Sequence, residues 1–191
     1  MSTVGNKMLA CLVGVLALAC ATAPQSKSGR QDLVSNAHNA IRSMQAADPS
    51  LGSKMRSSYA YAAFPGVGEG AFVVGGEYGR GVVFKNNQVM GFASLQSASV
   101  GLQAGGQTFD ELVLFQDQAA LERMINQGLS FTSQAEATAL QSGAAAQTNF
   151  RNGMAIFIKP VGGLIGSLSV AGQSIRFVPS GEAQRQGWLS H

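Results

Sequence analysis

The sequence predicts an α+β fold, in which N-terminal helices are followed by a mainly antiparallel β-sheet with one inserted helix. The first observation is a change in hydrophobic period, from about 3.6 residues before residue 56 to about two after residue 59. The second is a content of 24 glycines with only 5 prolines among 191 residues, which favours a sheet with tight turns and close backbone approaches. These patterns leave open whether the sheet curls towards a closed barrel.

The composition indicates one folded domain. The chain is 46% hydrophobic and only 12% charged, and this low charge argues against disorder. Its length suits a single domain with its own core. We assign that domain to residues 31–180 and residues 181–191 to a C-terminal tail.

The first nineteen residues are predicted to be a secretory signal peptide. Lys7 precedes an uncharged apolar run over residues 8–19, and the run closes on the small residue Ala19. These are the charged, apolar and cleavage-site parts of such a signal. The apolar run is shorter than the about 20 residues that a membrane-spanning helix needs.

The end of this signal predicts a lipid anchor at Cys20. Residues 16–20 (LALAC) resemble the lipobox of bacterial lipoproteins, in which the cysteine is acylated and becomes the mature N-terminus. Ala17 stands where leucine is usual, so simple cleavage after Ala19 is the alternative. The only other cysteine is Cys11, inside the signal, so the mature chain has no internal pair for a disulfide.

The residues after the cysteine predict its destination. In lipoproteins of this kind a residue other than aspartate after the cysteine, here Ala21, implies transfer to the outer membrane. We therefore expect a lipid-anchored protein of the cell outer membrane that faces the periplasm. Residues 20–30 are predicted to be the lipidated N-terminus and a flexible tether, because they are mostly small and polar.

Two N-terminal helices follow from the apolar spacing. Residues 32–45 place an apolar stripe, roughly 120° wide, opposite Ser35, Asn39 and Arg42. The stripe consists of Leu33, Val34, Ala37, Ala40, Ile41 and Met44. Asp48 and Pro49 then predict the N-cap and first turn of a short second helix.

The rest of the domain reads as strands with one helix between them. Strands are predicted over residues 82–84, 89–94, 100–105, 112–115, 154–158 and 164–171. Asn86 and Asn87 predict a hairpin turn, since asparagine tolerates positive φ. The inserted helix begins at the cap Asp117 and ends at Gly128, with Leu121, Met124 and Ile125 facing inward.

Residues for catalysis are scarce. His38 and His191 are the only histidines, and the sequence contains no Ser/His/Asp set, HExxH or CxxC. We therefore predict a non-enzymatic protein without cofactor or metal, and His38 as a solvated residue or a contact at the border of its helix stripe. The glycine-rich residues 76–81 lack the Gly-Lys-Ser/Thr of a phosphate loop and continue into a strand, so a bulge or close packing is expected there.

Three motifs, the first of them in two parts, follow one another in the order of the SYLF domain and resemble it. The opening segments are residues 59–65 (YAYAAFP) and 73–82 (VVGGEYGRGV), and the central one is residues 99–107 (SVGLQAGGQ). The closing segment is residues 162–172 (GGLIGSLSVAG), so that the resemblance covers about residues 31–178.

This resemblance implies a lipid-binding module. Eukaryotic members bind phosphoinositides through a basic, amphipathic N-terminal region, and some bind actin filaments, whereas bacterial members are often exported proteins that bind phospholipid. The present chain lacks a lysine cluster at the start of the domain and has no SH3 or FYVE domain. We therefore expect a phospholipid membrane as the partner, with actin at most a remote partner and no nucleic acid.

The distribution of charge agrees with a membrane partner. Five cations and two acids lie between Cys20 and Arg56, whereas seven cations and eight acids follow. The basic excess lies beside the predicted anchor, where anionic lipid attracts each Lys or Arg by about 1 kcal/mol. The predicted head-group ligands are Arg42, Lys54 and Arg56, as cations of the protein surface, and the alternative is an ordinary solvated face.

Three functional hypotheses remain at this point. The first is a non-enzymatic lipoprotein of the cell envelope that binds anionic phospholipid head groups. The second is a structural or interaction lipoprotein that binds envelope proteins and contacts lipid only through its acyl anchor. The third is a hydrolase of unfamiliar type, for which the sequence offers no evident general base.

Overall fold

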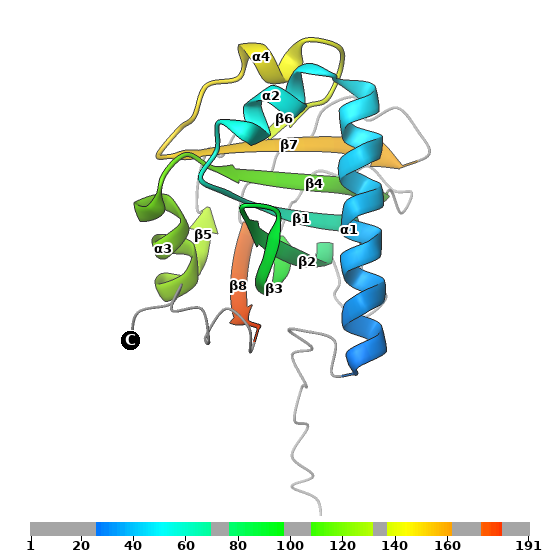
Figure 1. The fold of residues 1–191 in the computed structure, drawn as a ribbon, viewed down its shortest axis with the longest axis vertical. Coiled ribbons are helices and arrows are strands. Elements are labelled where there is room, and N and C mark those ends of the chain that lie inside the picture. Colours follow the sequence, from blue (N-terminus) through cyan, green and yellow to red (C-terminus); the bar gives the residue numbers. More distant parts are fainter. Residues whose placement is uncertain (1–25, 70–76, 98–107, 132–136, 162–172, 181–191) are drawn as a thin grey trace, which may run out of the picture.

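A computed structural model describes residues 26–69, 77–97, 108–131, 137–161 and 173–180. These residues form an α+β fold, as predicted, with a long N-terminal helix and a largely antiparallel sheet (Figure 1). The predicted signal peptide, Cys20, the C-terminal tail and the predicted strands over residues 100–105 and 164–171 lie outside the described residues.

Helix α1 (Lys27–Ala47) begins at a serine cap. The Ser26 Oγ accepts a hydrogen bond from the backbone N–H of Gly29 at 3.0 Å, which satisfies one donor of the first turn. The helix thus starts earlier than the apolar stripe, and residues 27–30 belong to it rather than to a tether. The stripe could not reveal this turn, because the turn is polar and largely exposed. Further along, Ala37, Ala40, Ile41 and Met44 of the stripe are buried, as predicted.

The connection to helix α2 (Ser50–Arg56) is built on Asp48, which is fully buried. Its Oδ1 accepts hydrogen bonds from the backbone N–H of Ser50 at 3.0 Å and from the Ser50 hydroxyl at 2.7 Å. The same oxygen accepts from Gly143 N at 3.1 Å, and Oδ2 accepts from Ala145 N at 2.6 Å. The N-cap residue of α2 is Pro49, one residue after the predicted cap Asp48. Asp48 still satisfies the N–H of the first helical residue, and it also holds the distant segment around α4 (Ala144–Gln147).

Eight strands form one sheet in the order β5-β8-β3-β2-β1-β4-β7-β6. All neighbouring pairs are antiparallel except β6 with β7. The strands are β1 (Ala60–Glu69), β2 (Glu77–Lys85), β3 (Gln88–Ser97), β4 (Thr108–Phe115), β5 (Leu129–Phe131), β6 (Ala137–Ala139), β7 (Met154–Val161) and β8 (Gln173–Pro179).

The predicted turn and inserted helix are both confirmed. Asn86 and Asn87 join β2 to β3 with φ of 51° and 61°. Helix α3 (Gln118–Gln127) has the Asp117 side chain accepting from Ala120 N at 2.8 Å, and it ends at Gly128, whose φ is 64°. Its inward residues include Leu121 and Met124, which are buried.

The sheet is strongly curled but not closed. The Gln173 Nε2 on β8 donates to the Glu111 Oε2 on β4 at 2.8 Å, although three strands separate β8 from β4 in the sheet. At a spacing of about 4.8 Å per strand, a flat sheet would hold these two strands roughly 19 Å apart. Within the described part of the chain, β5 and β6 remain as two unpaired edges, so the sheet does not form a barrel.

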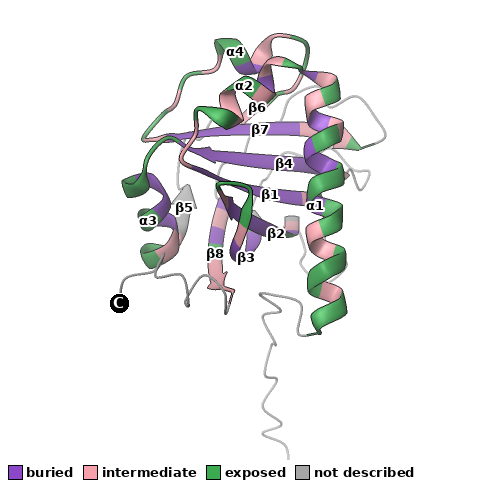
Figure 2. Ribbon diagram, viewed as in Figure 1, coloured by how far each residue is buried: buried purple, intermediate pink, exposed green. Residues whose placement is uncertain are grey.

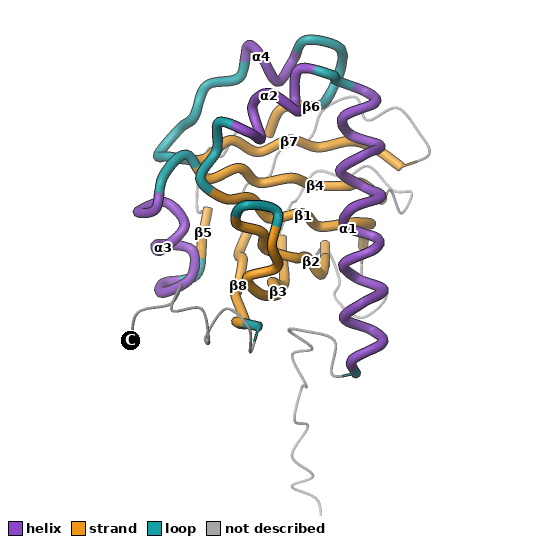
Figure 3. Tube along the Cα trace, in the orientation of Figure 1, coloured by secondary structure: helices purple, strands orange, loops and turns teal. Residues whose placement is uncertain are grey.

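The curled sheet has a core on each face. Strands β1, β4 and β7 are drawn mostly as buried (Figure 2), and helix α1 passes across the strands (Figure 3). The concave face is filled by side chains of the strands and of α3, including Phe64, Phe109, Phe115, Met124 and Ile175. The opposite face packs against α1, α2 and α4 through residues that include Ile41, Met44, Leu51, Phe84, Leu112 and Phe157. Helix α1 crosses the sheet on this second face and contacts β1, β2 and β4.

The glycine-rich stretch packs closely against β1, as expected for the part of it that is described. A Cβ at Gly79 would lie 2.7 Å from the Val67 Cγ2, and one at Gly81 would lie 2.7 Å from the Ala63 carbonyl oxygen. Real Cβ atoms do not approach other atoms so closely, so these positions require glycine. The stretch therefore serves packing within the sheet.

Candidate functional site

The three predicted lipid ligands lie in different environments. Arg42 is exposed on α1, and its Nη2 donates to the Asn39 Oδ1 one turn earlier. Arg56 is exposed at the end of α2, and its Nη2 donates to the Ser53 Oγ at 2.9 Å. These two residues are surface cations, as the sequence predicted. Cys20, the predicted lipidation site, lies outside the described residues.

Lys54, the third predicted lipid ligand, makes contacts within the protein. Its side chain is half-buried, its ammonium donates to the Thr148 carbonyl oxygen, and its Nζ lies 5.1 Å from the centroid of the Phe150 ring. These contacts join α2 to the segment between α4 and β7. The sequence around Lys54 could not predict these contacts, because Thr148 lies 94 positions further along the chain.

Arg56 lines a polar hollow of about 420 Å³ between α2, the start of β1 and the β2–β3 turn. Besides Arg56, its walls carry hydroxyl and amide groups from Gln45, Ser58, Tyr59, Tyr61, Asn86 and Asn87. The hollow therefore combines one exposed guanidinium with neutral hydrogen-bonding groups, which is the chemistry that binds a phosphate or carboxylate.

The phenols of this hollow are held in place by their neighbours. The Lys85 Nζ donates to the Tyr59 hydroxyl at 2.6 Å and lies 4.3 Å from the centre of that ring. The Tyr61 hydroxyl donates to the Asn87 Oδ1 at 2.9 Å. Burial raises the pKa of Tyr61 above its ordinary value, so this phenol stays protonated at neutral pH. Lys85 adds a second cation next to the hollow.

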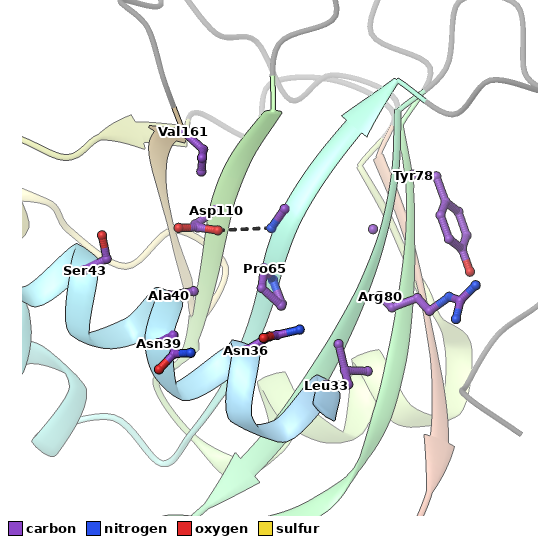
Figure 4. Close-up of a pocket in the computed structure, with 12 residues that line it drawn as sticks. Leu33, Asn36, Asn39, Ala40, Ser43, Pro65, Tyr78, Arg80, Asp110 and Val161 are labelled. Atoms are coloured by element: carbon purple, nitrogen blue, oxygen red, sulfur yellow. Dashed lines mark hydrogen bonds between the residues drawn. The ribbon is translucent and has the colours of Figure 1, made fainter. Parts of the chain in front are cut away.

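A larger groove of about 650 Å³ lies between α1 and the strands (Figure 4). Leu33 and Ala40 line it from α1, and Pro65 and Val161 line it from the strands. Val161 is 49% exposed, the one large hydrophobic side chain among the described residues that is open to solvent. The groove thus offers apolar surface beneath a helix, together with a few polar groups.

A β-bulge in β1 shapes the floor of this groove. The register of β1 shifts between Phe64 and Val67 relative to β4, and between Ala63 and Gly68 relative to β2. Gly66, in the bulge, has a φ of +62°, a conformation that favours glycine, and its N–H donates to the Asp110 Oδ1 at 3.0 Å. Bulges of this kind commonly redirect side chains next to functional sites.

Two buried polar side chains on the concave face were not predicted from the sequence. Glu111 and Gln173 are each 1% exposed, and their side chains are hydrogen-bonded to each other. The Gln173 Oε1 has no hydrogen-bond partner among the described residues. A polar residue at an inward position of a strand was the available signal, but only the curl of the sheet brings these two residues together.

The described residues include one histidine and several acids of the kinds that ligate metals. Among these residues, no group of three or more His, Cys, Asp or Glu side chains is placed so that it could hold a metal ion. His38 is exposed, and its ring centroid lies 5.1 Å from that of Phe84. It is therefore a contact at the border of the helix stripe, as predicted.

Comparison with known proteins leaves the family open. No protein-family model matches the chain, and a search of curated proteins found no significant match. Among the described helices, none has both the length and the apolar character to cross a membrane.

Proposed function

We propose that this protein is a non-enzymatic, phospholipid-binding lipoprotein of the bacterial cell envelope, which binds anionic head groups. It is acylated at Cys20, anchored in the outer membrane and faces the periplasm. The observation that carries the proposal is the position of Arg56, which is exposed and lines a hollow with phenol, hydroxyl and amide groups.

The chemistry of this hollow suits a lipid phosphate. A guanidinium forms charge-assisted hydrogen bonds to phosphate oxygens, and neutral amide donors, such as the NH₂ groups of Asn86 and Asn87, complete the set. Lys85, beside Tyr59, adds positive charge at the same place. Arg42 lies on α1 as an exposed cation and contributes a longer-range attraction to an anionic membrane, which salt screens over about 8 Å at physiological ionic strength.

Two features of the sequence support the same function. The segment that ends at Cys20 resembles a lipobox, and the basic excess falls between that cysteine and Arg56. The three ordered segments resemble the SYLF domain, whose bacterial members are often exported proteins that bind phospholipid. The proposal combines this resemblance with the Arg56 hollow.

Vesicle co-sedimentation tests the proposal. The mature chain from residue 20 onward, with Cys20→Ser to remove the acyl anchor, is mixed with phosphatidylcholine vesicles with or without phosphatidylglycerol. We expect binding to the anionic vesicles that weakens as salt rises. Replacing Arg56 with glutamine should weaken this binding about fivefold, the equivalent of about 1 kcal/mol per cation.

A matched control separates the site from overall charge. Arg176 is also exposed, but it lies on β8, away from the hollow. Arg176→Gln changes the net charge equally and should leave most of the binding intact. Equal losses in the two variants would mean that lipid does not use the Arg56 hollow. No binding to any vesicle by the parent protein would reject lipid recognition and favour an interaction lipoprotein that contacts lipid only through its anchor.

A further inference from the structure

We propose that the groove beneath α1 selects a phosphoethanolamine head group, in which a phosphate and a primary ammonium are joined by two carbons. This inference rests on the proposed function, since the ligand is a phospholipid, but it concerns a different site and a different selectivity. It assigns the ammonium to Asp110 and the phosphate to Arg80.

Asp110 and Arg80, which carry opposite charges, lie on the two strands that flank the bulge in β1. Asp110 on β4 lies next to the bulge, between the partners of Phe64 and Val67. Arg80 on β2 lies on the other side of β1, between the partners of Ala63 and Gly68. With β1 between them and a spacing of about 4.8 Å per strand, the two backbones are roughly 10 Å apart, a gap that a small zwitterion can bridge between two side chains.

Asp110 is prepared to receive an ammonium group. It is only 8% exposed, yet it lines the groove. The Gly66 N–H occupies its Oδ1 and fixes the carboxylate, while among the described residues no group hydrogen-bonds to its Oδ2 (Figure 4). A carboxylate in such a partly desolvated position interacts more strongly with an opposite charge than one in bulk water.

Arg80 supplies the complementary charge. It is exposed, lines the same groove, and its guanidinium has no hydrogen-bond or ion-pair partner within the described parts of the chain. Arginine is well suited to a phosphate because its planar donors match the phosphate oxygens. The acid at one side of the bulge and the base at the other are therefore complementary to a zwitterion.

The remaining walls suit the rest of a phospholipid. Asn36 and Asn39 line the groove from α1 (Figure 4) and offer amide groups to the ester region of the lipid. Leu33, Pro65 and Val161 add apolar surface for the first part of an acyl chain. The exposure of Val161 is explained if lipid covers it.

The same geometry disfavours the other common head groups. A choline head group carries a quaternary ammonium, which has no N–H to donate to Asp110. A glycerol head group can donate hydroxyl hydrogen bonds to Asp110, but it has no positive charge to pair with the carboxylate, so its contact there is weaker. The selectivity thus arises because these head groups leave the Asp110 carboxylate without a hydrogen-bonding ammonium partner, and it does not require strong binding to the preferred lipid.

Vesicles of constant surface charge test this selectivity. Each contains the same fraction of phosphatidylglycerol, and the remainder is either phosphatidylethanolamine or phosphatidylcholine. The mature chain with Cys20→Ser should bind the phosphatidylethanolamine vesicles about tenfold more tightly, the scale of one charge-assisted hydrogen bond. Soluble phosphoethanolamine should compete for this additional binding, and phosphocholine should not.

Single substitutions locate the effect. Asp110→Asn keeps an oxygen that can accept from the Gly66 N–H. This variant and Arg80→Gln, each made alone, should abolish the preference for phosphatidylethanolamine. The matched controls Asp117→Asn, at the start of α3, and Arg123→Gln, on the exposed side of α3, remove the same charges away from the groove and should retain the preference. Thermal melts of all four variants identify any that fail to fold.

The outcomes separate this inference from the proposed function. Equal binding of the parent protein to both kinds of vesicle, with no binding of soluble phosphoethanolamine, would overturn the phosphoethanolamine site and leave anionic lipid binding intact. A preference that survives in folded Asp110→Asn and Arg80→Gln proteins would overturn the assignment as well. If soluble phosphoethanolamine binds but the vesicles are not distinguished, the groove takes a free zwitterion and not a lipid. No binding to any vesicle would reject both proposals.

Discussion

Asp48 is the residue whose replacement should most clearly damage the fold. It is fully buried and accepts four hydrogen bonds, two from Ser50, one from Gly143 and one from Ala145. Asp48→Asn preserves the shape and one oxygen, but it turns an NH₂ group towards the Ala145 N–H. That N–H loses its acceptor in a buried place, and the other donors exchange a charged acceptor for a neutral one.

The expected loss of stability follows from these changes. A buried donor left without a partner costs about 1–3 kcal/mol, and hydrogen bonds to a charged group are stronger than those to a neutral one. We expect Asp48→Asn to lower the free energy of unfolding by about 3 kcal/mol. For a chain of this length the corresponding fall in Tm is roughly 6–12 °C.

Urea denaturation and thermal melts followed by circular dichroism measure this loss. The matched control is Asp117→Asn, because Asp117 is an exposed N-cap and asparagine caps a helix about equally well. That control should stay within about 0.5 kcal/mol of the parent protein. A similarly small change for Asp48→Asn would refute the argument that this carboxylate holds α2 and α4 together.

The same residue predicts a dependence on pH. Burial by itself would raise the pKa of Asp48, but the hydrogen bonds donated by Ala145, Ser50 and Gly143 outweigh it and hold the pKa below its ordinary value. The carboxylate therefore adds stability at pH values above the unfolded pKa, about 3.9. This contribution is lost as the pH falls through the lower, folded pKa. The difference in stability between the parent protein and Asp48→Asn should accordingly shrink in acid, as urea denaturation between pH 7 and pH 3 would reveal.

Three further substitutions test other parts of the account. Cys20→Ser should leave the protein without lipid and release it from the membrane fraction; palmitate labelling that does not depend on Cys20 would contradict the anchor. His38→Ala should alter neither fold nor any activity, because His38 is an exposed neighbour of Phe84, and a metal content or hydrolytic rate that disappears in this variant would contradict a non-enzymatic role. Lys54→Met should lower the free energy of unfolding by about 1–2 kcal/mol through loss of the Thr148 and Phe150 contacts, while Arg56→Gln, on the exposed side of the same helix, should change it by less than about 0.5 kcal/mol. Equal stabilities of these two variants would show that the contacts of Lys54 contribute nothing.

Local patterns were sufficient for the elements that depend on neighbours in the sequence. The helical stripe of residues 32–45, the turn at Asn86 and Asn87, and the limits of α3 at Asp117 and Gly128 are all confirmed. Each depends on hydrophobic period, on cap chemistry or on backbone conformations that few residues tolerate. The first turn of α1 was missed because it has a serine cap but no buried face.

The candidate sites depend on contacts that no local pattern contains. Arg56 was named from the basic excess, the SYLF resemblance and its position beside the first strand, and only the packing of α2 near the β2–β3 turn places it at a hollow. Lys54 was named for the same reasons, yet its ammonium donates to the Thr148 carbonyl oxygen and so contributes to tertiary packing. Asp110 and Arg80 were not singled out, since their relation comes from the register of three strands around one bulge.

The sequence by itself thus determined the fold class, three of the helices (α1, α2 and α3), the β2–β3 turn and the scarcity of catalytic residues. Each of these follows from residue types or from spacings of a few positions. Tertiary structure decided the curl of the sheet, the pairing of Glu111 with Gln173, and which cations are exposed. It also decided the partners of Asp48, which lie about a hundred positions further along the chain. Strand register and helix docking bring such distant residues together, and they are set by how all the apolar faces are buried at once.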